Sequence, residues 1–381
     1  MIRGFRVSAR PDWQKRVEAL GLAEPILPDG TPYWVEDRGY AIAKPQIDLL
    51  YDAAAELERL TLAAIDRIVQ HDLFDRFDLS PLAARLAGDS WDRQARNLIG
   101  RFDLAFVPGE APKLLEYNAD GAVSLIEAAR CQAEWCHAHA PGALQWNEIE
   151  AHLDNAWRAL GLPRLPVHFA GLKDDIEADR TLDYLAETAR AAGIDARRID
   201  LDEIGWDGEK FVDLEGQTMH ALAKIYPWAW LARDEFAAHL EVANTTVLEP
   251  AWRMLPADKR FLALLWEMFP DHPNLLPASL EPLAGPCVAK PALGRDGRGV
   301  AFHADGGMRP ATGGDGEPAD DDEGPLVWQE LAPTAQIDGR YLMAGVWCVA
   351  SQPSGLGLRE ADDPFVGGQA RFVPHIAEET T

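Results

Sequence analysis

Apolar residues follow two spacings along the chain, and each spacing predicts one kind of element. A recurrence every three to four positions over 45–70 predicts a long helix, because it places Leu50, Leu57 and Leu60 on one side. Further helices are predicted over 81–86, 124–139, 175–192 and 255–270. Short apolar runs bounded by Gly and Pro predict strands over 101–106, 114–120, 166–170, 193–199, 219–225, 287–291, 300–302, 326–331, 341–350 and 372–376.

The order of these elements favours a mixed α/β (α+β) protein built from three lobes. Between 165 and 204 a strand, a helix and a second strand follow one another, which is typical of a small parallel-sheet lobe. We predict that residues 1–160 carry the first helices and a polar hairpin, that 161–250 form the small lobe, and that 251–381 form a further lobe. Residues 304–325 are rich in Gly, Asp, Pro and Glu, which predicts an exposed, mobile loop.

Two strand-like runs near residue 100 concentrate polar side chains on one face. Period two puts Arg101 and Asp103 on the same face of the first strand, and Glu116 and Asn118 on the same face of the second. The segment 107–112 between them is typical of a hairpin connection. A half-buried hairpin with a salt-bridge network is the alternative to a binding site. We favour a site, because burying so much charge without partners is costly.

The side chains of this hairpin suit a magnesium site. Mg²⁺ requires hard oxygen ligands, usually one or two carboxylates with the remainder from water and nucleotide phosphates. Asp103, Glu116 and Asn118 are therefore candidate ligands of one or two Mg²⁺ ions. Arg101 beside them could neutralise charge that develops on a transferring phosphoryl group.

The segment after the second hairpin strand leads into a helix. Ser124 suits the N-cap of this helix and Glu127 its third position. Gly121 lies in the connecting loop, where a substrate or an anion could meet free backbone N–H groups.

A glycine-rich connection follows a strand that carries Lys290. Gly294, Arg295 and Gly297 lie in this connection, and a further short strand follows it. Such an arrangement is typical of a flap that covers phosphates, with bare backbone closing over them and Lys290 as a point charge. Glycine-rich hairpins are common, and no Gly-Lys-Ser/Thr opens a helix as in a P-loop. Its position after the carboxylate hairpin favours the nucleotide interpretation.

Composition narrows the possible partners. The 381-residue chain has a formal net charge of −26, which argues against a nucleic-acid partner. This charge is compatible with a cationic substrate, although acidic surfaces also arise from solubility alone. The four cysteines show no metal-ligand spacing and are expected to be free and buried. No apolar run approaches the length of a membrane span and no apolar leader is present, so we expect a soluble, cytoplasmic protein.

Several motifs together resemble a known family. The hairpin runs Arg101-Phe-Asp and Leu115-Glu-Tyr-Asn-Ala-Asp are similar to those of the synthetase domain of glutathionylspermidine synthetase and its shorter acid–amine ligase relatives. Matches extend over nearly the whole chain in the same order, at 224–230, 249–252, 288–291 and 372–375. The resemblance implies an ATP-grasp-like fold, with 251–381 as the nucleotide-binding lobe. It also implies ATP- and Mg²⁺-dependent joining of a carboxylic acid to an amine through an acyl phosphate.

The resemblance further implies roles for individual residues. Lys259 and Lys290 would hold phosphates, and the adenine would lie near Gln329, Glu330 and Leu331. The substrate contacts implied in this way are Gly121, Ser124, Asp175, Glu177 and Arg359. For Asp175 and Glu177 the alternative is interaction with a helix dipole, and for Arg359 it is an ordinary surface position.

Two departures from the family pattern affect the expected substrates. The family's glutathione-contacting serines are matched here by Gly121 and Val123, with Ser124 as the nearest hydroxyl, which puts glutathione itself in doubt. The bifunctional members also carry an amidase domain, which we expect to be absent. A non-catalytic ATP-binding scaffold and a phosphotransferase that stops at the phosphorylated acid remain alternatives, and the chain could be a monomer or a homodimer.

Overall fold

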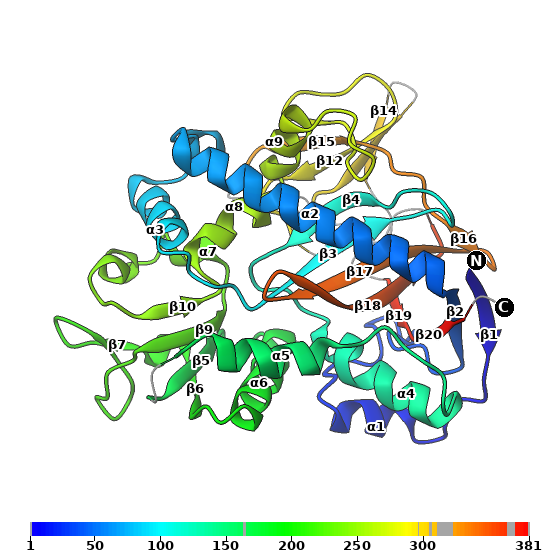
Figure 1. The fold of residues 1–381 in the computed structure, drawn as a ribbon, viewed down its shortest axis with the longest axis horizontal. Coiled ribbons are helices and arrows are strands. Elements are labelled where there is room, and N and C mark those ends of the chain that lie inside the picture. The colour runs from blue at the N-terminus through cyan, green and yellow to red at the C-terminus, as the bar shows by residue number, and fades with distance from the viewer. Residues whose placement is uncertain are drawn as a thin grey trace.

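A six-stranded antiparallel sheet forms the centre of the molecule (Figure 1). The computed structural model describes residues 2–162, 165–295, 297–304, 307–310, 323–363 and 370–379. Strands of this sheet lie in the order β19, β18, β17, β3, β4, and β16 pairs with β17. Their bounds are β3 (Ile99–Ala105), β4 (Lys113–Asn118), β16 (Gln336–Ile337), β17 (Arg340–Val349), β18 (Gln352–Ala361) and β19 (Arg371–Val373). The predicted hairpin therefore joins strands from the end of the chain in one sheet.

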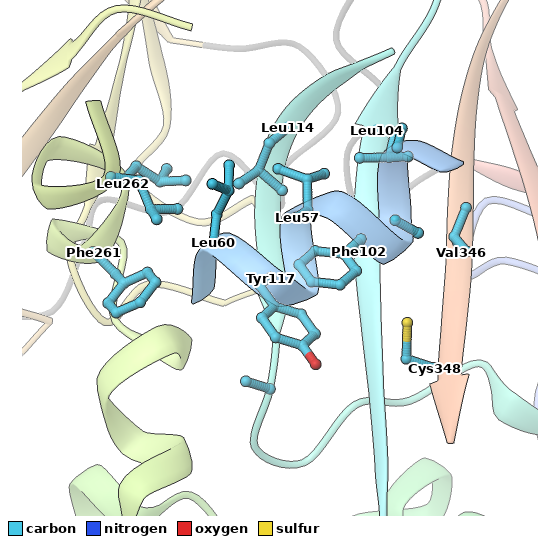
Figure 2. Packing of buried hydrophobic residues seen from close by; sticks show 14 of the residues in the cluster. Leu57, Leu60, Phe102, Leu104, Leu114, Tyr117, Phe261, Leu262, Val346 and Cys348 are labelled. Carbon is cyan, nitrogen blue, oxygen red and sulfur yellow. The ribbon is translucent and has the colours of Figure 1, made fainter. Parts of the chain in front are cut away.

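Helix α2 (Lys44–Gln70) crosses this sheet and confirms the long helix expected from the leucine spacing (Figure 1). Leu50, Leu57 and Leu60 are fully buried on its inner side. Figure 2 shows Leu57 and Leu60 beside Phe102 and Tyr117 of the hairpin, whose rings stack with centroids 3.8 Å apart. One face of the hairpin is thus part of the hydrophobic core, which leaves its other face for polar side chains.

A separate four-stranded parallel sheet confirms the predicted β-α-β organisation. Its strands lie in the order β10, β9, β5, β6, and α6 connects β5 to β6. Asp175 is the N-cap of α6, since its carboxylate accepts a hydrogen bond from the backbone N–H of Ala178 at 2.9 Å. The bounds are β5 (Val167–Gly171), α6 (Ile176–Ala191), β6 (Ala196–Asp200), β9 (Ala221–Ile225) and β10 (Thr246–Leu248).

A five-stranded sheet carries Lys290 and the glycine-rich connection. Its strands lie in the order β11, β15, β12, β13, β14, with α9 against β11. The bounds are β11 (Ala278–Ser279), β12 (Cys287–Pro291), β13 (Ala301–Ala304), β14 (Gly307–Pro310) and β15 (Leu326–Glu330). The prediction of a continuous loop over 304–325 is wrong where β14 pairs with β13, and residues 305–306 and 311–322 of it lie outside the described residues.

The remaining elements surround these sheets, and β1, β2 and β20 bring the two ends of the chain together (Figure 1). These strands and the short β7–β8 hairpin span β1 (Ile2–Arg6), β2 (Arg38–Ala43), β7 (Gly205–Trp206), β8 (Phe211–Val212) and β20 (His375–Glu378). The other α-helices are α1 (Trp13–Ala19), α3 (Pro81–Asp92), α4 (Gln132–His139), α5 (Ile149–Ala159), α7 (Trp228–Leu231), α8 (Met254–Ala257) and α9 (Arg260–Met268). Single 3₁₀ turns lie at Phe74–Phe77, Leu201–Glu203, Ala237–Glu241 and Ala251–Arg253.

Two helix predictions need correction. The helix expected over 255–270 is broken into α8 and α9, because Asp258 leaves the helical conformation and its carboxylate accepts the N–H of Arg260 at 2.8 Å. Lys259 lies at this break. Ser124 is not a regular N-cap: its φ of 67° is left-handed, whereas an N-cap residue is extended. The helix after it begins with a π-helical segment, Glu127–Cys131.

The lobe boundaries stay a prediction. Segment 251–381 contributes both to the five-stranded sheet and, through β17–β19, to the central sheet. Within the described part of the chain, no helix combines the length and the apolar character needed to cross a bilayer.

Candidate active site

A cavity of about 340 Å³ lies against the polar face of the β3–β4 hairpin. Its walls come from the hairpin, the N-terminal segment 22–28, the α8–α9 break and the glycine-rich connection after β12. The predicted residues that line it are Arg101, Asp103, Glu116, Asn118, Gly121, Ser124, Glu177, Lys259, Lys290, Gly294, Arg295, Gly297 and Arg359. Residues far apart in the sequence therefore meet in one space.

The hairpin register brings the four predicted polar side chains together. Arg101 lies opposite Asn118, and Asp103 lies opposite Glu116. The register shifts directly after Asp103, which marks a local irregularity of the kind often found next to functional sites. The shared polar face expected from the period of two is confirmed.

Asp103 is surrounded by donors. Arg101 approaches it in a two-pronged contact, with Nε 2.6 Å from Oδ1 and Nη2 2.9 Å from Oδ2. Arg359 of β18 donates to Oδ2 at 2.7 Å, and Asn118 Nδ2 lies 3.1 Å from the same oxygen. Burial lowers the pKa of Arg101, but the Asp103 charge outweighs it and the pKa is raised. Arg359 thus lies in the cavity and is not an ordinary surface arginine.

Two lysines flank Glu116. Lys259 Nζ lies 3.4 Å from Glu116 Oε2 and donates to the carbonyl of Gly294 at 2.6 Å. Burial opposes ionisation of Glu116, yet Lys259 and Lys290 lower its pKa to about 2, so it is a carboxylate at neutral pH. Burial lowers the pKa of Lys290 to about 8, with Glu116 acting in the opposite direction.

The side chain of Lys290 is fixed by neighbouring strands. Its ammonium donates to the carbonyl of Leu115 at 3.0 Å and to Gln329 Oε1 at 2.8 Å. Gln329 is buried, and its amide donates to the carbonyl of Leu114 at 2.9 Å. Gln329 therefore connects the five-stranded sheet to the hairpin and orients the lysine.

Further acidic groups line the cavity. Tyr33 donates a hydrogen bond to Glu127 at 2.8 Å, and its hydroxyl lies 3.3 Å from Ser124 Oγ. Burial raises the pKa of Glu127. Glu177 of α6 and Glu24 also line the cavity. Glu127 was predicted only as a helix-capping residue, because its partner Tyr33 comes from a remote segment.

Four predicted residues lie outside this lining. Asp175 lines a neighbouring groove, which shares Glu24 and Glu177 with the cavity. Gln329, Glu330 and Leu331 are described by the structure but do not line the cavity. Gln329 lies behind Lys290, and the other two are exposed at the end of β15. The adenine position near them stays a prediction.

No three His, Cys, Asp or Glu side chains among the described residues are arranged as a ready metal centre. The oxygen donors of the hairpin are instead Asp103, Glu116 and the amide of Asn118. Both oxygens of Asp103 accept hydrogen bonds from guanidinium groups. Glu116 and Asn118 are the hairpin oxygen donors that suit a hard cation without displacement of an arginine.

A family model described as glutathionylspermidine synthase preATP-grasp matches residues 5–378. The chain belongs to this family. Similarity to a Haemophilus influenzae protein named "Putative acid–amine ligase" is 34% identity over 98% of both chains. The resemblance inferred from the hairpin and its companion motifs is thereby confirmed.

Longer members of the glutathionylspermidine synthase family also match. The bifunctional glutathionylspermidine synthetase/amidase of Escherichia coli is 27% identical over 88% of this chain and 59% of its own length. Trypanothione synthetase of Crithidia fasciculata is 28% identical over 74% of this chain and 48% of its own length. The chain spans roughly half of these two relatives. The predicted reaction class, a C–N bond-forming ligase, agrees with the names of these relatives.

A solved structure supports the fold class. A glutathione synthetase-like effector from Globodera pallida aligns with a TM-score of 0.53 at 11% identity, over 89% of each chain. The predicted mixed α/β, ATP-grasp-like fold is confirmed.

Proposed function

We propose that this protein is an ATP-dependent carboxylate–amine ligase that forms an amide bond through an acyl phosphate. Its acid would be a peptide or amino-acid carboxylate, and its amine a polyamine or another cationic amine. The observation that carries this proposal is the combination of basic and acidic side chains in one cavity. Lys259, Lys290 and Arg295 line it, and so do Glu127 and Glu177.

The basic side chains of the cavity suit the phosphates of ATP. Lys259 and Lys290 supply compact positive charges, and the connection containing Gly294 and Gly297 brings backbone close to the cavity. Arg295 extends from the same connection, with its guanidinium 5.8 Å from the Trp230 ring centre. We assign these groups to phosphate binding and keep the adenine near the end of β15.

Glu116 and Asn118 would hold Mg²⁺, with remaining positions filled by water and phosphate oxygens. Asp103 could join them after exchange of one of its arginines. When bound, the ion offsets negative charge on the phosphates. A guanidinium released from Asp103 would then be available to the transferred phosphoryl group, which gives Arg101 and Arg359 a place in the reaction.

The reaction balances without a protein nucleophile. A carboxylate oxygen of the acid attacks the γ-phosphorus of ATP, the phosphorus–oxygen bond to ADP breaks, and an acyl phosphate forms. The amine nitrogen, after losing a proton, attacks the acyl carbon. The carbon–oxygen bond to phosphate then breaks, phosphate leaves with the electron pair, and the second proton of the nitrogen passes to the released phosphate as the amide forms.

The acidic side chains of the cavity suit a cationic amine or an α-amino group. Gly121 and Ser124 follow the hairpin in the chain and line the same cavity, and Glu177 lines both the cavity and the groove that contains Asp175. Carboxylates placed around a cavity attract an ammonium group and disfavour a second acid there. We therefore assign Gly121, Ser124, Asp175 and Glu177 to substrate binding.

Phosphate release from Mg·ATP tests the proposal. The panel combines glutathione, γ-glutamyl dipeptides and free amino acids as acids with spermidine, 1,3-diaminopropane and ethanolamine as amines. Release that requires one acid and one amine, and that Asp103→Ala and Glu116→Ala abolish, is the expected result. Asp154→Ala, at an exposed ion pair on α5, is the matched control and should retain activity.

Other outcomes separate the alternatives. Acid-dependent release that ignores the amine would identify a phosphotransferase. Nucleotide binding without release from any pair in the panel would favour a scaffold.

A further inference from the structure

Two motifs that the proposed mechanism does not use meet behind the hairpin. They are the runs 224–230 and 249–252, which the sequence singles out only as family resemblances, and Arg253 directly follows the second run. Glu249 receives the backbone N–H groups of Leu98 and Ile99, each at 2.9 Å. Both groups lie where β3 begins, so this carboxylate fixes the start of the strand.

Arg253 holds both strands at once. Its side chain is fully buried. Its guanidinium donates to the carbonyl of Ala119 at 2.8 Å, to the carbonyl of Ile99 at 2.7 Å and to the Tyr117 hydroxyl at 2.7 Å. One carbonyl belongs to the start of β3 and the other directly follows β4.

This contact lies where strand pairing ends. Arg101 and Asn118 form the last paired positions of the two strands, and beyond them the chains diverge. Arg253 bridges two carbonyls past this pair, that of Ala119 next to Asn118 and that of Ile99 two residues before Arg101. A buried carbonyl that loses its donor costs free energy, so a shift of either strand is penalised. The guanidinium thus replaces a missing step of the hydrogen-bond ladder.

Gly100 makes room for this guanidinium. A Cβ atom at position 100 would lie 2.3 Å from Arg253 Nη2 and 2.9 Å from the Tyr117 hydroxyl. No side chain fits there unless both Arg253 and Tyr117 move. The residue directly before Arg101 is therefore matched to the arginine on the opposite face.

The run 224–230 extends this network of buried contacts. The Lys224 ammonium pairs with Asp120 at 2.9 Å, and the backbone N–H of Trp228 donates to the same carboxylate. The indole of Trp228 donates to the carbonyl of Glu249 at 2.8 Å. The segment that follows β9 of the parallel sheet therefore binds Asp120, directly after Ala119, and also Glu249, which fixes the start of β3.

We propose that Arg253 is a positioning residue that sets the spacing of Arg101, Asn118 and Glu116 on the cavity face. This inference rests on the proposed function, since those side chains are assigned there to phosphate and Mg²⁺. A buried charge is costly compared with an apolar residue of similar size, so a role limited to stability is poorly served by an arginine. Three directed donors held at one point fix geometry, which an apolar side chain does not.

The test compares Arg253→Met and Arg253→Lys with wild type. Affinity for a non-hydrolysable ATP analogue is measured by calorimetry with Mg²⁺ and with EDTA, next to the melting temperature and the folded fraction. We expect Arg253→Met to lower the Mg²⁺-dependent gain in affinity about 10–100-fold, as loss of an outer-shell partner does. The EDTA affinity, set by the lysines, should change less than about threefold. Arg253→Lys, which keeps the charge with fewer directed donors, should fall in between.

Gly100→Ala provides a second route to the same result. It displaces the guanidinium without removing it, so it should reduce the Mg²⁺-dependent gain in the same direction. Combined with Arg253→Met, it should add less than it does in wild type, because the guanidinium is already gone and only the contact with Tyr117 is left to displace. Arg10→Met, which breaks the largely buried Arg10–Glu36 pair near the N-terminus, is the matched control. It should lower the melting temperature and keep the Mg²⁺-dependent gain.

The outcomes are distinct. If folded Arg253→Met and Gly100→Ala keep the full Mg²⁺-dependent gain, Arg253 has only a structural role and the inference is overturned. If wild type shows neither nucleotide binding nor an effect of Mg²⁺, the proposed function fails first and removes the basis for this role.

Discussion

The two faces of the β3–β4 hairpin both carry buried charge, but they use it in different ways. On the cavity face, Asp103 is bound by side chains, and these partners border an open space. On the core face, Glu249 and Arg253 bind mainly to backbone groups. Side-chain pairs beside a cavity can exchange partners when a ligand enters, whereas backbone bonds in a closed core cannot. The comparison separates charge that takes part in binding from charge that fixes geometry.

The largest expected effect on stability comes from the core face. Arg253→Met leaves the carbonyls of Ile99 and Ala119 without this donor and removes the positive charge 3.8 Å from Glu249, in a closed space. Breaking a buried ion pair typically costs about 3–5 kcal/mol of unfolding free energy. Urea denaturation of the variant and of wild type measures this difference. A loss below about 1 kcal/mol would mean that the core face relaxes as easily as the cavity face.

Asp103→Ala should show the opposite balance between activity and stability. Arg101 and Arg359 lose a partner but can turn toward the cavity and its water, so we expect a stability loss of only about 1 kcal/mol. Activity should fall about 10²–10³-fold, as expected when a group that organises transition-state charge is removed. Steady-state phosphate release and urea denaturation on the same preparation check both statements. Equal stability losses for Asp103→Ala and Arg253→Met would remove the distinction between the faces.

The pH dependence of Lys290 sharpens the comparison on the cavity side. Burial lowers its pKa to about 8 in the folded protein, below its ordinary value of 10.5. Above pH 8 the Lys290 ammonium loses its proton in the folded protein. Affinity for the ATP analogue should then fall by about tenfold for each further pH unit, because binding uses the protonated lysine.

The deprotonation of Lys290 should have the opposite effect on protein stability, which should rise with pH. Between pH 8 and 10.5 the unfolded chain binds more protons at this lysine than the folded chain, so its contribution to stability rises with pH. Lys290→Met should remove both trends. Calorimetric titrations and urea denaturation from pH 7 to about 10 test this, and an unchanged affinity profile in the variant would assign the titration to another group.

The smallest effect is expected at Gln329. Gln329→Met removes one acceptor of Lys290 and the donor to the carbonyl of Leu114, while both strands stay paired. We expect a stability loss of about 1 kcal/mol and a severalfold weaker affinity for the ATP analogue. Gln329→Glu, which keeps an acceptor for Lys290, should retain the affinity. An effect as large as that of Lys290→Met would instead place Gln329 in direct contact with the nucleotide.

The polar face of the hairpin could be predicted from sequence because it depends only on a period of two and one turn. Arg101, Asp103, Glu116 and Asn118 need no other element to meet. Family resemblance alone supplied Arg359, since nothing local in β18 points to Asp103. The broken helix at Lys259 was missed because the apolar run 261–266 was extended back to Leu255 across the charged residues 258–260, and the break depends on a side-chain bond of Asp258.

The core face was invisible to sequence reasoning for a physical reason. Gly100 is the residue before Arg101 in an ordinary apolar strand, and its small size matters only because Arg253 approaches from a remote segment. Glu127 was likewise interpreted from its helix alone, although Tyr33 from the N-terminal segment determines its environment. Contacts between segments far apart in sequence have no local period from which they can be predicted.

The sheet topology has a consequence for how the protein is made. On the ribosome, β3 and β4 emerge long before β17 and β18, the strands that complete their sheet. In the same way, β2 emerges long before its partner strand β20. Such long-range pairing is slow and leaves strand edges exposed during synthesis. Asp103 cannot meet Arg359 until β18 has been synthesised, so a nascent chain that ends before β18 carries carboxylates but no assembled cavity. Activity therefore reports that synthesis has passed β18 and that the distant strands have paired.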